Sequence, residues 1–139
     1  MQLKQTKNGD LPVPTKVYRQ LLDAALAAHP LECCGLLLGR AGRITVVREC
    51  ANVHPTPQSH FEIDPQALID AHKVEREGGL RLMGYFHSHP KGDPHPSETD
   101  KAMAAHDGKV WAIIADSGMM FWVDGKDRFH ALSYDVGNR

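Results

Sequence analysis

The stretch that decides the fold is Gly84–Lys101, GYFHSHPKGDPHPSETDK. Its first residues are typical of a strand, a loop with three prolines follows, and Ser-x-x-Asp then has the spacing of a helix N-cap. Residues two apart on a strand point to the same face, so His87 and His89 should project side by side. Because Ser97 and Asp100 open the next helix, we expect this stretch to bring a strand end and a helix start together.

Two imidazoles and one carboxylate in this arrangement predict a metal site. Zinc accepts imidazole nitrogens and carboxylate oxygens at roughly 2.0–2.2 Å, and a catalytic zinc keeps its fourth position for water. Asp100 is the natural third ligand after His87 and His89, because a proline-stiffened loop returns the chain at modest entropic cost. The alternative is that Ser97 and Asp100 serve only as a capping box for the helix.

Outward from this stretch, the hydrophobic pattern predicts alternating helices and strands. Helices are predicted over 14–29, 65–77 and 97–106, and strands over 34–38, 43–50, 61–64, 80–87, 110–115, 119–123 and 128–134. This order predicts an α/β fold with a mixed β-sheet sandwiched by helices. The 139 residues show no repeat and no linker, so we expect a single domain over 1–139 with its core at about 12–134.

Composition narrows the class of protein. The net charge of −1 does not indicate the basic surface that binding to nucleic acid or to an anionic membrane would require. No apolar run approaches the roughly 18 residues of a membrane span, and the polar N-terminus does not resemble a secretory signal. Three cysteines, two of them adjacent, do not form a disulfide framework, so we expect a cytoplasmic protein.

Glu32 stands directly before a short apolar run, in PLECCGLLLG. Burying a carboxylate in a hydrophobic core is unfavourable, so Glu32 is either a solvated residue at the start of the strand or a functional acid. A zinc hydrolase needs a general base, and Glu32 is the candidate for that role.

Three motifs together resemble the JAMM (MPN+) metalloprotease family. They are P-x-E-x-x-G-L-L-x-G at 30–39, H-S-H-P at 87–90 and S-x-x-D at 97–100. The family pattern is an upstream Glu, then His-Ser/Thr-His, seven residues, Ser, two residues and Asp, and every one of these positions is matched. The segment at 52–65, NVHPTPQSHFEIDP, is also similar to small prokaryotic members.

The resemblance implies a role for each matched residue. The fold would be the three-layer architecture shared by MPN domains and cytidine deaminases. His87, His89 and Asp100 would bind one zinc ion per chain. Glu32 would be the general base that takes a proton from the attacking water, and Ser97 would donate a hydrogen bond to the oxyanion.

The resemblance also implies a substrate class. Members of the family cut peptide or isopeptide bonds, often after the C-terminal Gly-Gly of a ubiquitin-like protein. Only 42 residues follow Ser97, which leaves no room for a long insertion and favours a small prokaryotic member acting on a ubiquitin-like sulfur-carrier protein. Two alternatives remain: a RadC-like protein, and a catalytically silent MPN-type scaffold that binds partners. The sequence predicts neither the substrate-binding residues nor the oligomeric state.

Overall fold

The computed structural model describes residues 10–137. The helices and strands follow one another in the order β1 (Leu11–Pro14), α1 (Thr15–Ala28), β2 (Cys34–Arg40), β3 (Arg43–Cys50), α2 (Pro65–Arg76), β4 (Arg81–His89), α3 (Glu98–Met103), β5 (Val110–Ala115), β6 (Gly118–Asp124), β7 (Phe129–Leu132) and β8 (Tyr134–Gly137). Within this part of the chain, no helix combines the length and apolar character that crossing a bilayer requires.

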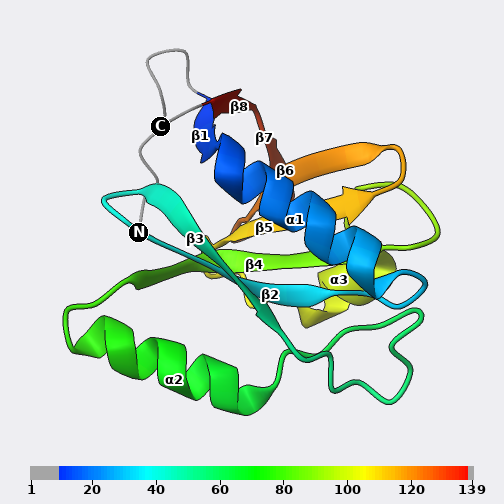
Figure 1. The fold of residues 1–139 in the computed structure, drawn as a ribbon, viewed down its shortest axis with the longest axis horizontal. Coiled ribbons are helices and arrows are strands. Elements are labelled where there is room, and N and C mark those ends of the chain that lie inside the picture. Colours follow the sequence, from blue (N-terminus) through cyan, green and yellow to red (C-terminus); the bar gives the residue numbers. More distant parts are fainter. Residues whose placement is uncertain (1–9, 138–139) are drawn as a thin grey trace.

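The main sheet has six strands in the order β3-β2-β4-β5-β6-β7 (Figure 1). Strands β4 and β5 are parallel, and the other neighbours are antiparallel, so the sheet is mixed as predicted. The parallel pair needs a crossover, which α3 and its flanking loops provide. The end of β4 therefore lies in the middle of the sheet, directly before the loop that leads to α3.

Helices cover both faces of this sheet. Successive residues of β2 point to opposite faces, and Leu37 packs with α1 residues such as Val17 and Leu21. Its neighbour Leu36 packs instead in the cluster that contains Ala71 of α2 and the indole of Trp111. The predicted mixed sheet between helices is confirmed (Figure 1).

Two short strands were not predicted. β1 pairs in parallel with β8, from Leu11 opposite Tyr134 to Pro14 opposite Gly137, outside the main sheet. The prediction of one strand over 128–134 is wrong in this detail, because the chain leaves β7 after Leu132 and resumes as β8. Two prolines in β1 conceal its strand character, and its partner lies more than 100 residues away, where no local pattern can reveal it.

The boundaries around the central loop also differ from those predicted. β4 continues to His89, two residues beyond the predicted end, so both histidines belong to the strand. α3 ends at Met103, whereas a helix was predicted as far as His106. Residue 106 has a positive φ of 56°, which a helix cannot accommodate. The predicted strand at 61–64 is reduced to a single bridge between Asn52 and Ile63.

Gly84 is required where β4 and β5 lie side by side. It is the register partner of Val110, and a Cβ at residue 84 would overlap the Val110 backbone. We expect Gly84→Ala to lower the free energy of unfolding by about 3 kcal/mol, measured by urea denaturation. Gly78→Ala is the control, since its φ of 86° is strained for alanine but no atom obstructs the Cβ, and it should cost about 1 kcal/mol. Equal losses in the two variants would contradict the steric explanation.

Candidate metal centre

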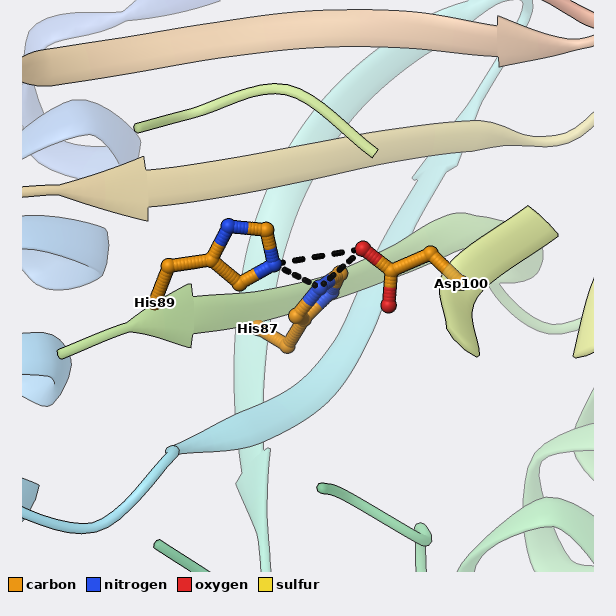
Figure 2. A group of neighbouring side chains, drawn as sticks. All are labelled: His87, His89 and Asp100. Atoms are coloured by element: carbon orange, nitrogen blue, oxygen red, sulfur yellow. Dashed lines mark hydrogen bonds and ion pairs between the residues drawn. The ribbon is translucent and has the colours of Figure 1, made fainter. Parts of the chain in front are cut away.

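Three side chains converge at the end of β4. The Nε2 atoms of His87 and His89 lie 3.1 Å apart. The Oδ2 atom of Asp100 lies 3.1 Å from the first of these nitrogens and 3.2 Å from the second (Figure 2). The predicted placement of both histidines on one face of the strand is therefore confirmed.

The geometry of this triad fits a zinc ion. Ligands bound tetrahedrally to one zinc at roughly 2.0–2.1 Å are separated by about 3.3–3.4 Å, close to the three observed separations. Two Nε2 atoms at 3.1 Å cannot both carry a hydrogen that points at the other. A cation between the three atoms removes this conflict, so His87, His89 and Asp100 form a group that could hold a metal ion.

Burial and mutual contacts set the charge of the triad. Burial lowers the pKa of His87, which is fully buried, and favours the neutral imidazole that a metal ligand requires. Burial would raise the pKa of Asp100, but the hydrogen bonds with His87 and His89 outweigh it and hold that pKa well below its usual range. Asp100 is therefore a carboxylate although only 3% of it is exposed.

The capping interpretation of Ser97 and Asp100 is confirmed, and it is compatible with Asp100 as a metal ligand. The Asp100 N–H donates to Ser97 Oγ at 3.0 Å, and the Ser97 N–H donates to Asp100 Oδ2 at 2.9 Å, which completes a capping box. The same Oδ2 atom faces the two histidines, so the cap holds the carboxylate in position for the metal centre. Ser97 itself is exposed and lies at the edge of the site.

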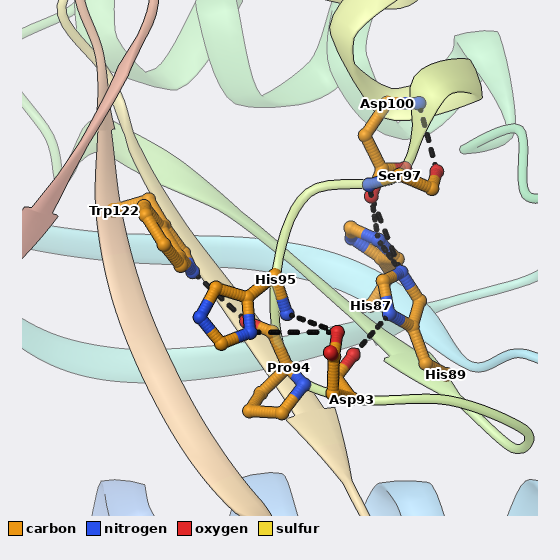
Figure 3. A network of polar contacts seen from close by, with 8 residues as sticks. All are labelled: His87, His89, Asp93, Pro94, His95, Ser97, Asp100 and Trp122. Atoms are coloured by element: carbon orange, nitrogen blue, oxygen red, sulfur yellow. Dashed lines mark hydrogen bonds and ion pairs between the residues drawn. The ribbon is translucent and has the colours of Figure 1, made fainter.

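His89 is oriented by the loop between β4 and α3. Its Nδ1 donates to the backbone carbonyl of Asp93 at 2.7 Å, which leaves Nε2 free to face the other ligands. The next residue, Pro94, is buried, and its carbonyl accepts a hydrogen bond of 3.0 Å from the indole N–H of Trp122 (Figure 3). Strand β6 thus anchors the loop segment that orients His89, a member of the group that could hold a metal ion.

This anchor leads to a prediction for metal affinity. Trp122→Phe keeps an aromatic ring but leaves the Pro94 carbonyl without its donor, so the loop should hold His89 less firmly. We expect zinc affinity to fall about tenfold, measured by competition with a chelating dye. Tyr134→Phe is the control, because it removes a comparable bond of 2.7 Å to the Met119 carbonyl without touching the loop. An unchanged zinc affinity in Trp122→Phe would contradict this role for the indole.

Glu32 lies beside the triad but is not part of it. Cys34 is the register partner of His87, and the Ser88 N–H donates to the Cys33 carbonyl at 3.2 Å. Continued by two residues beyond the Cys34–His87 pair, this antiparallel register would place Glu32 opposite His89. Glu32 is buried, and burial raises its pKa to about 7, while the charge of His89 acts to lower it and that of Asp100 to raise it. A carboxyl group with this pKa can both accept and release a proton near neutral pH.

Backbone contacts hold Glu32 at this place. Its N–H donates to the Pro57 carbonyl at 2.8 Å, and its carbonyl accepts from the Asn52 side chain at 3.0 Å. Neither Asn52 nor Trp122 was predicted to support the site. The proline-rich loop at 52–60 gave no signal of these contacts, because on the side of Glu32 they use only the backbone N–H and carbonyl, which any residue carries.

The chain is similar to several known proteins. The chain is 33% identical over 119 residues to a desampylase of Haloferax volcanii, which covers 82% of this chain and 84% of the relative. It is 38% identical over 90 residues to a protein of Thermus thermophilus named a probable TtuB-protein conjugate cleaving protease, covering 65% and 60%. A JAB1/MPN domain protein of Archaeoglobus fulgidus has the same fold, with a TM-score of 0.63, 19% identity, and coverage of 93% of this chain and 98% of that one.

The family model that matches is described as the prokaryotic homologs of the JAB domain, and it matches residues 14–125. The matched part contains β2, β4 and α3, which carry or adjoin the residues of the candidate centre. The chain therefore belongs to the prokaryotic JAB/JAMM (MPN) domain family.

Proposed function

We propose that this protein is a zinc-dependent peptidase or isopeptidase that cuts after the C-terminal Gly-Gly of a ubiquitin-like protein, in particular a sulfur carrier. Residues 12–134 would act as one catalytic domain. The observation that carries the proposal is Glu32, a buried carboxyl group with a raised pKa that interacts electrostatically with His89 and Asp100 of the His-His-Asp triad. A site that only bound a structural metal would not require such a group.

Each of the five residues has a defined task in this proposal. His87, His89 and Asp100 hold the zinc ion. When bound, zinc supplies Lewis acidity, which lowers the pKa of water to roughly 7 and polarises a carbonyl group. Glu32 accepts the proton of the attacking water and later passes it to the leaving amine. Ser97 uses its hydroxyl oxygen as the helix cap, so its hydroxyl hydrogen is available for the oxyanion.

The relatives support the substrate class. The names of the Haloferax and Thermus relatives describe a desampylase and a protease that cleaves TtuB-protein conjugates. The second name describes the cleavage of a conjugate between two proteins, which is the kind of substrate that this proposal assigns. Glycines at the cleavage point suit the exposed but crowded edge of the site, where the substrate backbone must approach buried ligands closely.

Intact-mass spectrometry of a small carrier protein tests this function. The carrier ends in Gly-Gly and is extended by a few residues, and we expect zinc-loaded protein to release the extension after the second glycine. A carrier with Ala-Ala in place of Gly-Gly is the matched substrate control and should be cut far more slowly. Equal rates on both carriers would refute the requirement for glycine, and no cleavage of a peptide- or isopeptide-linked carrier would refute the activity.

A further inference from the structure

A second feature of the molecule is a cleft of about 290 Å³ on the α2 side of the sheet. Its walls include the rings of Phe61, Tyr85 and Trp111, and the side chain of Leu68 on α2. This volume is small for a whole organic ligand but sufficient for one long side chain.

The cleft adjoins the candidate metal centre. Phe61 lines it and stacks on the ring of His87 with the centroids 4.3 Å apart. Trp111 also lines it and contacts the same imidazole edge-on at 5.7 Å. A substrate bound at the metal centre would therefore lie close to this cleft.

The charge of the cleft is negative and locally concentrated. Its lining contains the acidic residues Glu62, Asp107 and Asp124, and no Lys, Arg or His is among the lining residues within 10–137. The whole chain has a net charge of only −1, so this grouping is not a consequence of general acidity. Aromatic rings together with carboxylates are complementary to a guanidinium or ammonium group, through cation–π attraction and charge-assisted hydrogen bonds.

Asp124 carries the strongest indication that a ligand is accepted here. Only 1% of the residue is exposed, and its Oδ2 accepts the His106 N–H at 3.0 Å. Its Oδ1 atom has no hydrogen-bond partner in the part of the chain that the structure describes. The Nδ1 of His106 lies 3.6 Å from Oδ1 but is 2.9 Å from the Gly125 carbonyl, to which it donates. A buried carboxylate oxygen without a donor is costly, and a cationic donor would remove that cost.

We propose that this cleft binds a basic side chain, arginine or lysine, of the substrate close to the scissile bond. This inference rests on the proposed function for the identity of the substrate, but the site itself can be detected without any catalysis. The basic side chain can come from the tail of the carrier or from the residues beyond its Gly-Gly, and the two sources can be separated by experiment.

Binding is tested first by NMR on the intact ¹⁵N-labelled protein. The chain has two tryptophans. Trp111 lines the cleft and its indole N–H has no hydrogen-bond partner within 10–137, whereas the indole N–H of Trp122 donates to the Pro94 carbonyl. We expect N-acetyl-arginine amide to shift the Trp111 indole signal and to leave that of Trp122 in place. N-acetyl-citrulline amide, which has the same shape without the charge, should shift neither. Equal responses to the two compounds would overturn the proposal.

Two variants show whether Asp124 is responsible. Asp124→Asn keeps the shape and an oxygen for the His106 N–H but removes the charge, and it should weaken the response to arginine about tenfold. Asp127→Asn is the matched control, because Asp127 is exposed and does not line this cleft. If both variants respond as the wild type does, the cleft does not bind through Asp124.

The source of the side chain is tested with the extended carrier. Arginine or glutamine is placed in turn at each of the positions before Gly-Gly, and separately at each position after it. We expect arginine at one position to raise kcat/KM about tenfold, and Asp124→Asn to remove that preference. Indifference on both sides of Gly-Gly, with cleavage intact, would overturn the inference and leave the proposed function standing. An arginine-specific NMR shift without cleavage of any carrier would support the cleft and refute the proposed function.

Discussion

Replacing Asp100 with alanine is expected to abolish zinc binding and peptidase activity together. Its Oδ2 atom lies 3.1 and 3.2 Å from the two imidazole nitrogens and supplies the only carboxylate of the triad. Two histidines on one strand cannot complete a three-ligand site, so the variant should contain almost no zinc after equilibrium dialysis, measured by elemental analysis. Zinc at full occupancy in Asp100→Ala would refute the assignment of this ligand.

Ser97→Ala is the matched control for this prediction, because Asp100 also caps α3. The serine variant breaks the bond from the Asp100 N–H to Ser97 Oγ and should cost about 1 kcal/mol of stability. It leaves all three ligands in place, so it should retain zinc while losing turnover, since the proposed oxyanion donor is gone. If Ser97→Ala loses zinc as completely as Asp100→Ala does, then capping alone explains the loss.

The central strand β5 and the start of α2 were predicted better than the strands β1 and β8. Val110–Ala115 is a continuous apolar run, and the predicted strand has the bounds that the structure shows. The start of α2 was also predicted at the residue where the structure begins it, Pro65, and the Asp64 side chain before it accepts the Gln66 N–H at 3.1 Å. Both signals are local, because they depend on apolar runs and on residues within one turn. The β1–β8 pair has no such signal, since two four-residue strands join opposite ends of the chain.

In the site, too, features with a local sequence signal could be predicted and features that depend on distant contacts could not. The grouping of His87, His89 and Asp100 was predicted because the residue types and their spacing occur within one short stretch of sequence. The supporting contacts were not identified, because they use backbone carbonyls that any residue carries, such as that of Pro94 under the Trp122 indole. The unpartnered oxygen of Asp124 could not be predicted either, since a sequence does not show which carboxylates are buried without donors.

Changing Glu32 to glutamine should leave the zinc content and the fold intact but lower kcat about 10²–10⁴-fold, the usual contribution of a general base. Glutamine has nearly the same shape, and the contacts that hold this residue, from its N–H to Pro57 and from Asn52 to its carbonyl, are made by the backbone and survive the change. The amide cannot accept the proton of the attacking water, so the chemical step should slow while KM changes little.

A matched acid distinguishes this effect from a general loss of charge. Glu49 lies on β3 with its side chain exposed, and Glu49→Gln removes the same charge from the neighbouring strand without touching the triad. We expect Glu49→Gln to retain full turnover and both variants to bind one zinc per chain, measured on the same preparations. Because burial raises the pKa of Glu32 to about 7, its environment favours proton exchange near neutrality. Turnover at the wild-type rate in Glu32→Gln would remove Glu32 from the chemistry and, with it, the observation on which the peptidase proposal depends.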